Sequence, residues 1–166
     1  MSRITNMDDW DDEDGPLRQG RWERNTETTI KGKRGQKVLR QLEAALVALP
    51  LPELTDELFW REPSDMERDI ADAYGVVAAP QVCVLGAYAR HIGVDYQKAE
   101  WLNEESVSEV APWAADELGM AYTLAWNLMF ENDEAWAYAT PRRRYDGILK
   151  WVRQNLSTPI ANEEER

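Results

Sequence analysis

The segment at residues 120–130 is apolar almost all round, and this constrains the fold more than any other feature of the chain. Its only polar side chains are Thr123 and Asn127, which lie four residues apart and therefore on one seam of a helix. A helix without a polar face is normally buried at the centre of a bundle. The sequence therefore predicts several helices packed around residues 120–130.

The flanking sequence has helical patterns with recognisable ends. Val38, Leu42, Ala45 and Leu49 form an apolar stripe at spacings of three and four, and Pro50 ends it. Further helices are expected at residues 82–91 and 95–102. Residues 75–80 are the only plausible strand, which allows a small hairpin near residues 75–83.

Three helix starts are marked by capping sequences. Ser64 and Glu67 have the spacing of a capping box, in which both side chains accept backbone N–H groups. Ser106 begins a second box, and Thr140 is followed by a proline at the first helical position. The fold class expected from all these patterns is all-α, a single-domain bundle of about five to seven helices.

Length and composition favour one domain with charged ends. With 166 residues and 43% hydrophobic content, the chain can bury one core, expected over residues 21–156. Residues 1–20, with six acids around Trp10, are expected to be a flexible arm, and residues 157–166 an acidic tail. The single Cys83 allows no internal disulfide, and residues 1–30 contain no signal-like apolar run. A cytoplasmic protein without a membrane span is therefore expected.

Charge is strongly segregated along the chain, which has a formal net charge of −12. Residues 41–139 hold nineteen acidic and four basic side chains, whereas residues 31–40 hold five basic side chains and no acidic one. Phosphate binding depends on clustered Lys and Arg, so adhesion of the whole molecule to nucleic acid or anionic lipid is unfavourable. A basic host protein or nucleoprotein complex is the expected partner.

The expected partner-binding residues combine aromatic rings with carboxylates. Phe59 and Trp60 lie in a loop-like stretch just before Pro63, where large aromatic rings have less reason to be buried. Aromatic residues are the usual anchors of protein interfaces. The acidic contacts are expected at Glu53, Asp56, Glu57, Asp65, Glu67, Asp69, Asp72, Glu104, Glu105 and Glu109.

The basic run at the start of the first predicted helix has two interpretations, which both remain open. The first interpretation is an RNA or phosphate contact. The glycines would let the backbone approach a phosphate, and the Lys and Arg side chains would neutralise the phosphate charge, although the residue order of a P-loop is absent. The alternative is internal pairing with the acidic body. The candidate phosphate contacts are Lys31, Lys33, Arg34 and Lys37.

Charged residues on both sides of the loop before the last predicted helix are unfavourably placed. Glu131, Asp133 and Glu134 follow a helix end, while Arg142–Arg144 begin the next helix, so both groups oppose their own helix dipoles. Pairing between the groups would relieve both conflicts and predicts an intramolecular clasp. The alternative is that one group is free for a partner.

No catalytic set is evident. Cys83 and His91 would lie about 12 Å apart along one helix, too far for a thiolate–imidazole pair. The acids at 131–134 lack the glycine-containing loop of an EF-hand, so no metal and no cofactor are expected. Residues 114–127 resemble a helix-turn-helix through Ala115, Gly119 and Ala125, but residues 120–130 contain no Lys or Arg to contact DNA. An enzyme is therefore not expected.

Several motifs carry a resemblance over most of residues 30–156. They are the glycine-containing basic run, the Val-Cys-Val-Leu-Gly-Ala-Tyr-Ala-Arg sequence ending at Arg90, the Leu-Gly pair at Leu118, Asn132-Asp-Glu, Thr140-Pro and Trp151-Val. In this order they resemble a group of bacteriophage and prophage proteins, a resemblance that implies no particular activity.

The function expected from these observations is that of a non-enzymatic phage-type accessory protein. It would bind a host nucleic-acid-handling or defence complex, such as a CRISPR effector, and inhibit or modulate it, with carboxylates in place of phosphates. It would act in the host cytoplasm if phage-encoded. The alternative is an RNA- or DNA-binding regulator that uses residues 31–40; direct nucleic-acid binding is the less favoured of the two.

Overall fold

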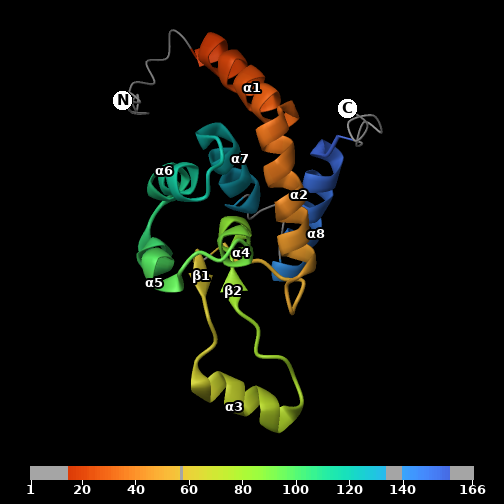
Figure 1. Ribbon diagram of the computed structural model, residues 1–166, viewed down its shortest axis with the longest axis vertical. Helices are drawn as coiled ribbons and strands as arrows, with labels where there is room; N and C mark the ends of the chain where they lie inside the picture. Colours follow the sequence, from red (N-terminus) through yellow and green to blue (C-terminus); the bar gives the residue numbers. More distant parts are fainter. Residues whose placement is uncertain (1–14, 57, 134–139, 158–166) are drawn as a thin grey trace, which may run out of the picture.

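The computed structural model describes residues 15–56, 58–133 and 140–157, and this part of the chain is all-α apart from one small sheet (Figure 1). The expected fold class is therefore confirmed. The elements in order are α1 (Gly15–Lys31), α2 (Lys33–Val47), β1 (Trp60–Arg61), α3 (Asp65–Tyr74), β2 (Gln81–Val82), α4 (Val84–His91), α5 (Tyr96–Ala99), the 3-10 helix η2 (Glu100–Glu104), α6 (Val107–Glu117), α7 (Tyr122–Asp133) and α8 (Pro141–Asn155).

The helix ends follow most of the capping signals. The Ser64 hydroxyl accepts the Glu67 N–H at 3.2 Å, the Glu67 carboxylate accepts the Ser64 N–H at 2.8 Å, and Gly75 ends α3 with a φ of 64°. Thr140 accepts the Arg143 N–H at 3.2 Å at the start of α8. The second box is only half formed, because the Ser106 hydroxyl bonds the Glu109 carboxylate and caps no backbone N–H.

The N-terminal helix lies partly where an arm was expected. α1 begins at Gly15, inside the segment 1–20 for which the acidic composition predicted a flexible arm. Residues 1–14 and 158–166 lie outside the described residues. α1 joins the body through Ile30, which is buried, and through Trp22, whose ring packs edge-on against those of Tyr122 and Trp126.

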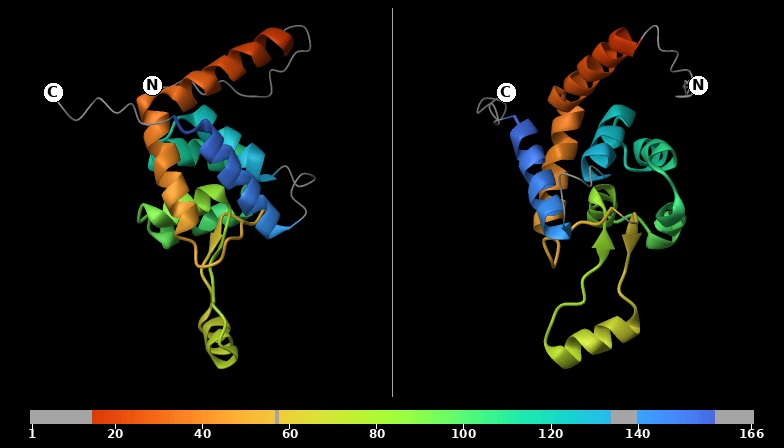
Figure 2. Two further views of the ribbon diagram at one scale, coloured as in Figure 1. Left: turned by 90° about the vertical axis from the view of Figure 1, so that its right-hand side faces the viewer. Right: turned by 180° about the vertical axis from the view of Figure 1, so that it is seen from behind.

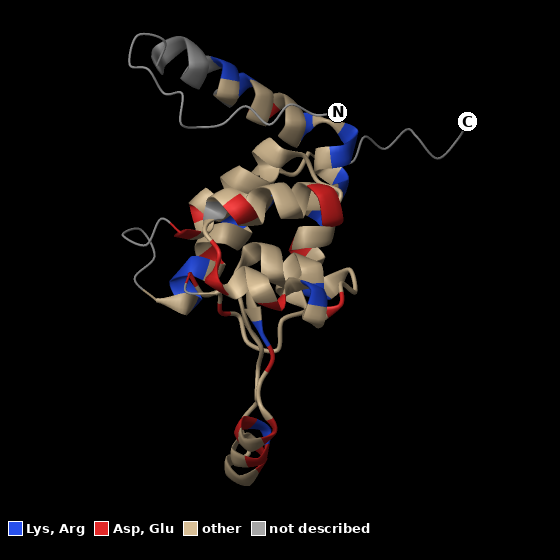
Figure 3. Ribbon diagram, turned by 90° about the vertical axis from the view of Figure 1, so that its left-hand side faces the viewer, with Lys and Arg blue, Asp and Glu red and all other residues tan. Residues whose placement is uncertain are grey.

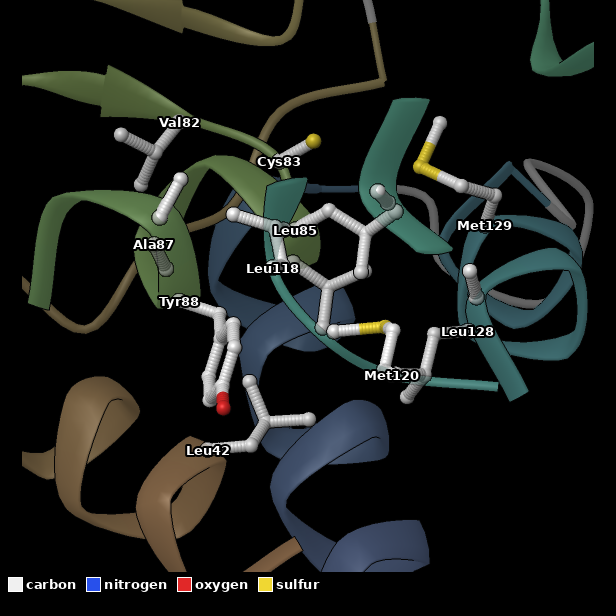
Figure 4. Packing of buried hydrophobic residues seen from close by; sticks show 14 of the residues in the cluster. Leu42, Val82, Cys83, Leu85, Ala87, Tyr88, Leu118, Met120, Leu128 and Met129 are labelled. Atoms are coloured by element: carbon white, nitrogen blue, oxygen red, sulfur yellow. The ribbon is translucent and has the colours of Figure 1, made fainter. Parts of the chain in front are cut away.

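The core is centred on α4 more than on the segment at 120–130. Figure 4 shows side chains from α2, α4 and α7 gathered around α4, in which Leu85 and Ala89 are fully buried. α7 contributes Leu124 and Leu128 to the core from one side, while Phe130 is 53% exposed. The apolar character of α7 thus extends beyond the surface that its neighbours cover. None of the described helices is long and apolar enough to cross a membrane.

The small sheet carries a long excursion of the chain. β1 and β2 are antiparallel, with Trp60 opposite Val82 and Arg61 opposite Gln81. The hairpin expected near residues 75–83 thus takes its other strand from residues 60–61, with α3 between the two strands. We call residues 62–80 the α3 finger; it projects from the end of the molecule opposite α1 (Figures 1 and 2).

A polar network joins the base of the finger to α7 and α8. The Arg144 side chain is almost fully buried, and its Nε donates to the carbonyl oxygen of Asn132 at 2.8 Å. Its carboxylate partner is Asp56, whereas Arg142 pairs with Asp146 on the next turn of α8 at 3.2 Å.

The clasp predicted between Arg142–Arg144 and the acids at 131–134 is therefore corrected for Arg142 and Arg144, which form ion pairs with Asp146 and Asp56. Burial raises the pKa of Asp133, and the nearby charge of Arg144 opposes this rise, so these two groups still interact. Arg144 does hold the end of α7, but through a main-chain carbonyl, and its charge is balanced by Asp56. The reason is that the start of α8 also lies against the loop after α2, where Leu54 N–H donates to the Pro141 carbonyl at 3.1 Å. Glu134 lies outside the described residues.

Candidate partner-binding surface

The two aromatic residues expected to contact a partner are part of the core. Phe59 is 2% exposed and packs edge-on against Trp113, with ring centroids 5.4 Å apart. Trp60 is 5% exposed and packs against Tyr96 at 5.2 Å, and its indole N–H donates to Glu62 at 2.8 Å. The premise that these rings lack a reason to be buried is wrong. They offer no surface to a partner in this structure.

Long-range pairing explains this burial. The Trp60 N–H donates to the Asn103 side-chain oxygen at 2.8 Å, and the Asn103 amide donates back to the Trp60 carbonyl at 2.9 Å. On the other side, Trp60 lies opposite Val82 in the sheet. These partners are 43 and about 20 residues away, so the local sequence around Trp60 looks like a loop although its backbone is fixed.

Exposed apolar side chains are concentrated on the α3 finger instead. Met66 is 69% exposed, Ile70 51% and Tyr74 79%. Their spacing of four residues places them on one face of α3, and we call them the apolar stripe. Val76 and Val77 follow them, also more than half exposed. Exposed apolar patches on a soluble protein typically mark interaction sites.

The finger is not required by the core. None of the residues 62–80 belongs to the buried hydrophobic cluster of the described chain, and Ala71 is the only buried side chain of α3. The apolar stripe is therefore not part of the buried cluster that stabilises the body. Its exposure is not explained by folding.

Carboxylates flank the apolar stripe. Asp65, Asp69 and Asp72 lie on a neighbouring face of α3 at spacings of three and four, and Arg68 is the only basic residue of the finger. The Asp65 side chain is 98% exposed, and its nearest cation, Arg68, is 3.5 Å away. Figure 3 shows the acidic finger and the basic residues of α1 at opposite ends of the molecule. The structure thus brings together three of the expected acidic contacts.

Glu67 lies on the same helix but has a structural role. Arg61 belongs to the two-stranded sheet from which the finger projects, which we call the stalk. The Arg61 guanidinium donates to both carboxylate oxygens of Glu67, at 2.9 and 3.0 Å, and the Ser64 N–H donates to the same carboxylate. These hydrogen bonds, with that of Arg61 the largest cause, lower the pKa of Glu67 to about 2. Glu67 therefore orients α3 on its stalk and is not available as a free carboxylate.

The other expected acidic contacts are dispersed. Asp56 is paired with Arg144. Glu109 bonds the hydroxyls of Ser106 and Ser108, which lower its pKa. Glu104 and Glu105 are exposed at the end of η2, an element separate from the finger. Glu53 is exposed beside the finger, and Glu57 lies outside the described residues.

A groove of about 770 Å³ separates the finger from the body. Its apolar lining comes from the finger, from the loop after α2 and from the start of α8, namely Ile70, Val76, Val77, Leu51, Leu54 and Pro141. Its charged groups include two pairs, Arg61 with Glu67 and Arg144 with Asp56. Because Ile70 belongs both to the stripe and to the groove, the two form one continuous surface. Sequence reasoning missed this surface, although the spacing of Met66, Ile70 and Tyr74 is a visible signal.

The basic segment is partly neutralised from within. Lys31 pairs with Glu27 on the preceding turn, and Arg34 Nε donates to the Gly119 carbonyl at 2.8 Å. Lys33 and Lys37 are exposed. The groove beside this segment, about 230 Å³, is lined by Val38, Ala121 and Leu124 as well as by Lys33 and Arg34. Lys31 and Arg34 therefore have internal contacts, but with Glu27 of α1 and a main-chain carbonyl, so pairing with the acidic body stays a prediction.

The described residues contain no evident catalytic centre. Cys83 is buried at the start of α4, and burial raises the pKa of its thiol to about 12, so it is not a nucleophile. His91 is exposed at the other end of α4. No cluster of metal-ligating side chains occurs in the described ranges. α6 and α7 are joined through Gly119, at a φ of 65°, but α7 carries no Lys or Arg.

Comparison of the chain with protein-family models, with curated proteins and with solved structures finds no match.

Proposed function

We propose that this protein is a non-enzymatic binding protein that recognises a basic protein or nucleoprotein complex through its α3 finger. One observation carries the proposal: no residue of the finger belongs to the buried hydrophobic cluster, yet the finger presents exposed carboxylates beside exposed apolar side chains. Such a combination is costly in a free protein and is stabilised when a complementary surface covers it.

The proposed mechanism is competition with nucleic acid. Asp65, Asp69 and Asp72 would occupy Lys or Arg sites that otherwise hold phosphates. A host nucleic-acid-handling or defence complex, whose basic sites hold phosphates, is the kind of partner that such carboxylates would occupy, and its inhibition is the expected outcome. Exposed charges act over about 10 Å at moderate salt, so association should weaken as salt rises.

The test is a capture experiment followed by displacement of nucleic acid. The full chain is immobilised and incubated with nuclease-treated host lysate at low and high salt, beside the variants D65N/D69N/D72N and E104Q/E105Q. We expect a basic nucleic-acid-binding protein to be retained by the wild type and by E104Q/E105Q, but not by the finger variant. The soluble chain should then release nucleic acid from the purified partner. Equal capture of the partner by all three proteins would exclude the finger as the partner-binding site.

A second candidate function is supported by the exposed cations of α2. Lys37 and Arg40 are exposed on α2, the helix that directly follows α1. A regulator that binds RNA or DNA through residues 31–40 would use this surface. Retention that depends on nucleic acid and is abolished by K37A/R40A would favour this function over the first.

A further inference from the structure

The partner of the finger can be specified further from the shape and charge of the apolar stripe. Resting on the proposed function, we propose that the stripe and the adjoining groove receive an amphipathic helix of the partner. The apolar face of that helix packs on Met66, Ile70 and Tyr74, and Lys or Arg side chains on its flank face Asp65, Asp69 and Asp72.

The geometry of the stripe suits a helix. Residues 66, 70 and 74 lie about 6 Å apart along α3, so the stripe is about 12 Å long, or roughly two helical turns. A row of side chains at spacings of four forms the ridge that packs into the groove of another helix. The groove beside Ile70 offers a second wall through Val77 and Leu51. This is the arrangement of helix-in-groove recognition.

The charge of the finger selects the occupant. Residues 62–80 carry five acids and one base, so pairing of the finger with the finger of a second copy would bring like charges together. A nucleic acid is repelled for the same reason. The groove is also a poor site for a small charged ligand, because Arg61 and Arg144 are already paired with Glu67 and Asp56. A helix with a basic flank satisfies both the apolar and the acidic faces.

The size of the surface sets the expected affinity. α3 has ten residues, about 15 Å of helix, so the contact falls at the small end of specific interfaces. Dissociation constants in the micromolar range are therefore expected. Tyr74 is the most exposed ring of the finger and the type of residue that dominates interface energies. Loss of this ring alone should weaken binding about tenfold.

The test uses defined peptides, so that it does not depend on the natural partner. A fluorescently labelled Leu/Lys peptide of about 16 residues with one apolar helical face is titrated with the full chain and followed by anisotropy. The controls are a scrambled peptide of the same composition and a Leu/Glu peptide with the same apolar face. We expect the Leu/Lys helix to bind at least tenfold more tightly than either control. Equal binding of the scrambled peptide would overturn the proposal.

Variants of the chain locate the binding surface. M66Q/I70Q/Y74Q retains good helix formers, and circular dichroism should confirm that α3 persists. This variant should lose at least tenfold in affinity for the Leu/Lys peptide. The matched control V47Q/F130Q alters two other apolar residues, 60% and 53% exposed, and should bind within about twofold of the wild type. Equal losses in both variants would overturn the proposal.

The helix inference and the proposed function can fail separately. If D65N/D69N/D72N abolishes capture of the basic partner but M66Q/I70Q/Y74Q does not, the inference falls and the proposed function stands. If neither variant affects capture, both fall. Sedimentation adds one more outcome: a wild-type dimer that M66Q/I70Q/Y74Q converts to a monomer would assign the stripe to a second copy and overturn the inference.

Discussion

The Nη2 atom of Arg144 lies 2.6 Å from Oδ2 of Asp56, joining side chains 88 residues apart in sequence. The same guanidinium donates to the carbonyl oxygens of Asn132 at 2.8 Å and of Leu54 at 3.3 Å. Arg144 therefore ties the start of α8 to the end of α7 and to the loop that forms the base of the groove. These hydrogen bonds hold together the part of the body that lies next to the base of the finger.

Replacement of Arg144 should destabilise the whole domain. Arg144→Met leaves two buried carbonyl oxygens without their donor, and each unsatisfied buried acceptor typically costs about 1–3 kcal/mol. Urea unfolding followed by tryptophan fluorescence measures the loss. The neighbouring Arg143 is exposed, so Arg143→Met should change the free energy of unfolding by less than about 0.5 kcal/mol. Similar effects of the two changes would contradict the role of Arg144.

Phe59 should behave as a core residue. Phe59→Ala removes a buried ring and its edge-on contact with Trp113, which should cost about 3–5 kcal/mol. Tyr74→Ala, on the exposed stripe, should change stability by less than about 0.5 kcal/mol. Denaturant unfolding of the two variants gives this comparison directly. A mild effect of Phe59→Ala would mean that the ring is not in the core.

Gly86 should not tolerate even alanine. A Cβ at this position would lie 1.9 Å from the carbonyl oxygen of Phe59, so α4 or the strand beside it would have to move. The expected cost is about 3 kcal/mol or more, because overpacking here displaces backbone rather than a flexible side chain. Thermal unfolding checks this value. At Gly32, the nearest atom would be 3.2 Å away, so Gly32→Ala should be much milder.

The attachment of α3 should depend on pH through Glu67. Its pKa is lowered from the usual 4.5 to about 2 by the hydrogen bonds from Arg61 and Ser64. Because the folded-state pKa is lower, the stabilisation is complete above pH 4.5 and is lost as the pH falls toward 2. Carbon NMR should show half-protonation of Glu67 near pH 2, with the Cα shifts of α3 changing in the same window.

The Glu67→Gln variant is the control for this titration. Gln is uncharged at every pH and resembles the protonated carboxyl group, so the acid-dependent change in the α3 shifts should disappear in the variant. Half-protonation of Glu67 near 4.5 in the wild type would show that the bonds to Arg61 and Ser64 do not persist in solution.

Local signals predicted the elements better than they predicted the surfaces. The capping residues Ser64 and Thr140 mark true helix starts because caps are satisfied within one turn of the chain. The core position of Phe59 and Trp60 depends on Asn103 and Val82, which no local pattern identifies. The same limit applies to Arg144, whose carboxylate partner Asp56 lies far away in the sequence.

The finger shows that hydrophobic spacing alone does not tell whether a helix face is buried. The stripe of Met66, Ile70 and Tyr74 has the spacing of a core-facing helix, and only the position of α3 on its stalk shows that this face is exposed. Conversely, α4 is buried at every position from Val84 to Ala89, whatever its hydrophobic spacing, because α2 and α7 pack against it. Hydrophobic spacing identifies a face but not what covers it.

Removal of the finger tests whether it is the binding surface and whether the domain folds without it. Residues 63–79 are replaced by Gly-Asn-Gly, which gives a five-residue hairpin loop between the paired residues Arg61 and Gln81. Binding of the Leu/Lys peptide is then measured beside the free energy of unfolding. We expect the shortened chain to have a free energy of unfolding within about 1 kcal/mol of the wild type, as for changes outside the core, and no measurable binding of the peptide. Binding retained at wild-type affinity by the shortened, folded chain would contradict this expectation.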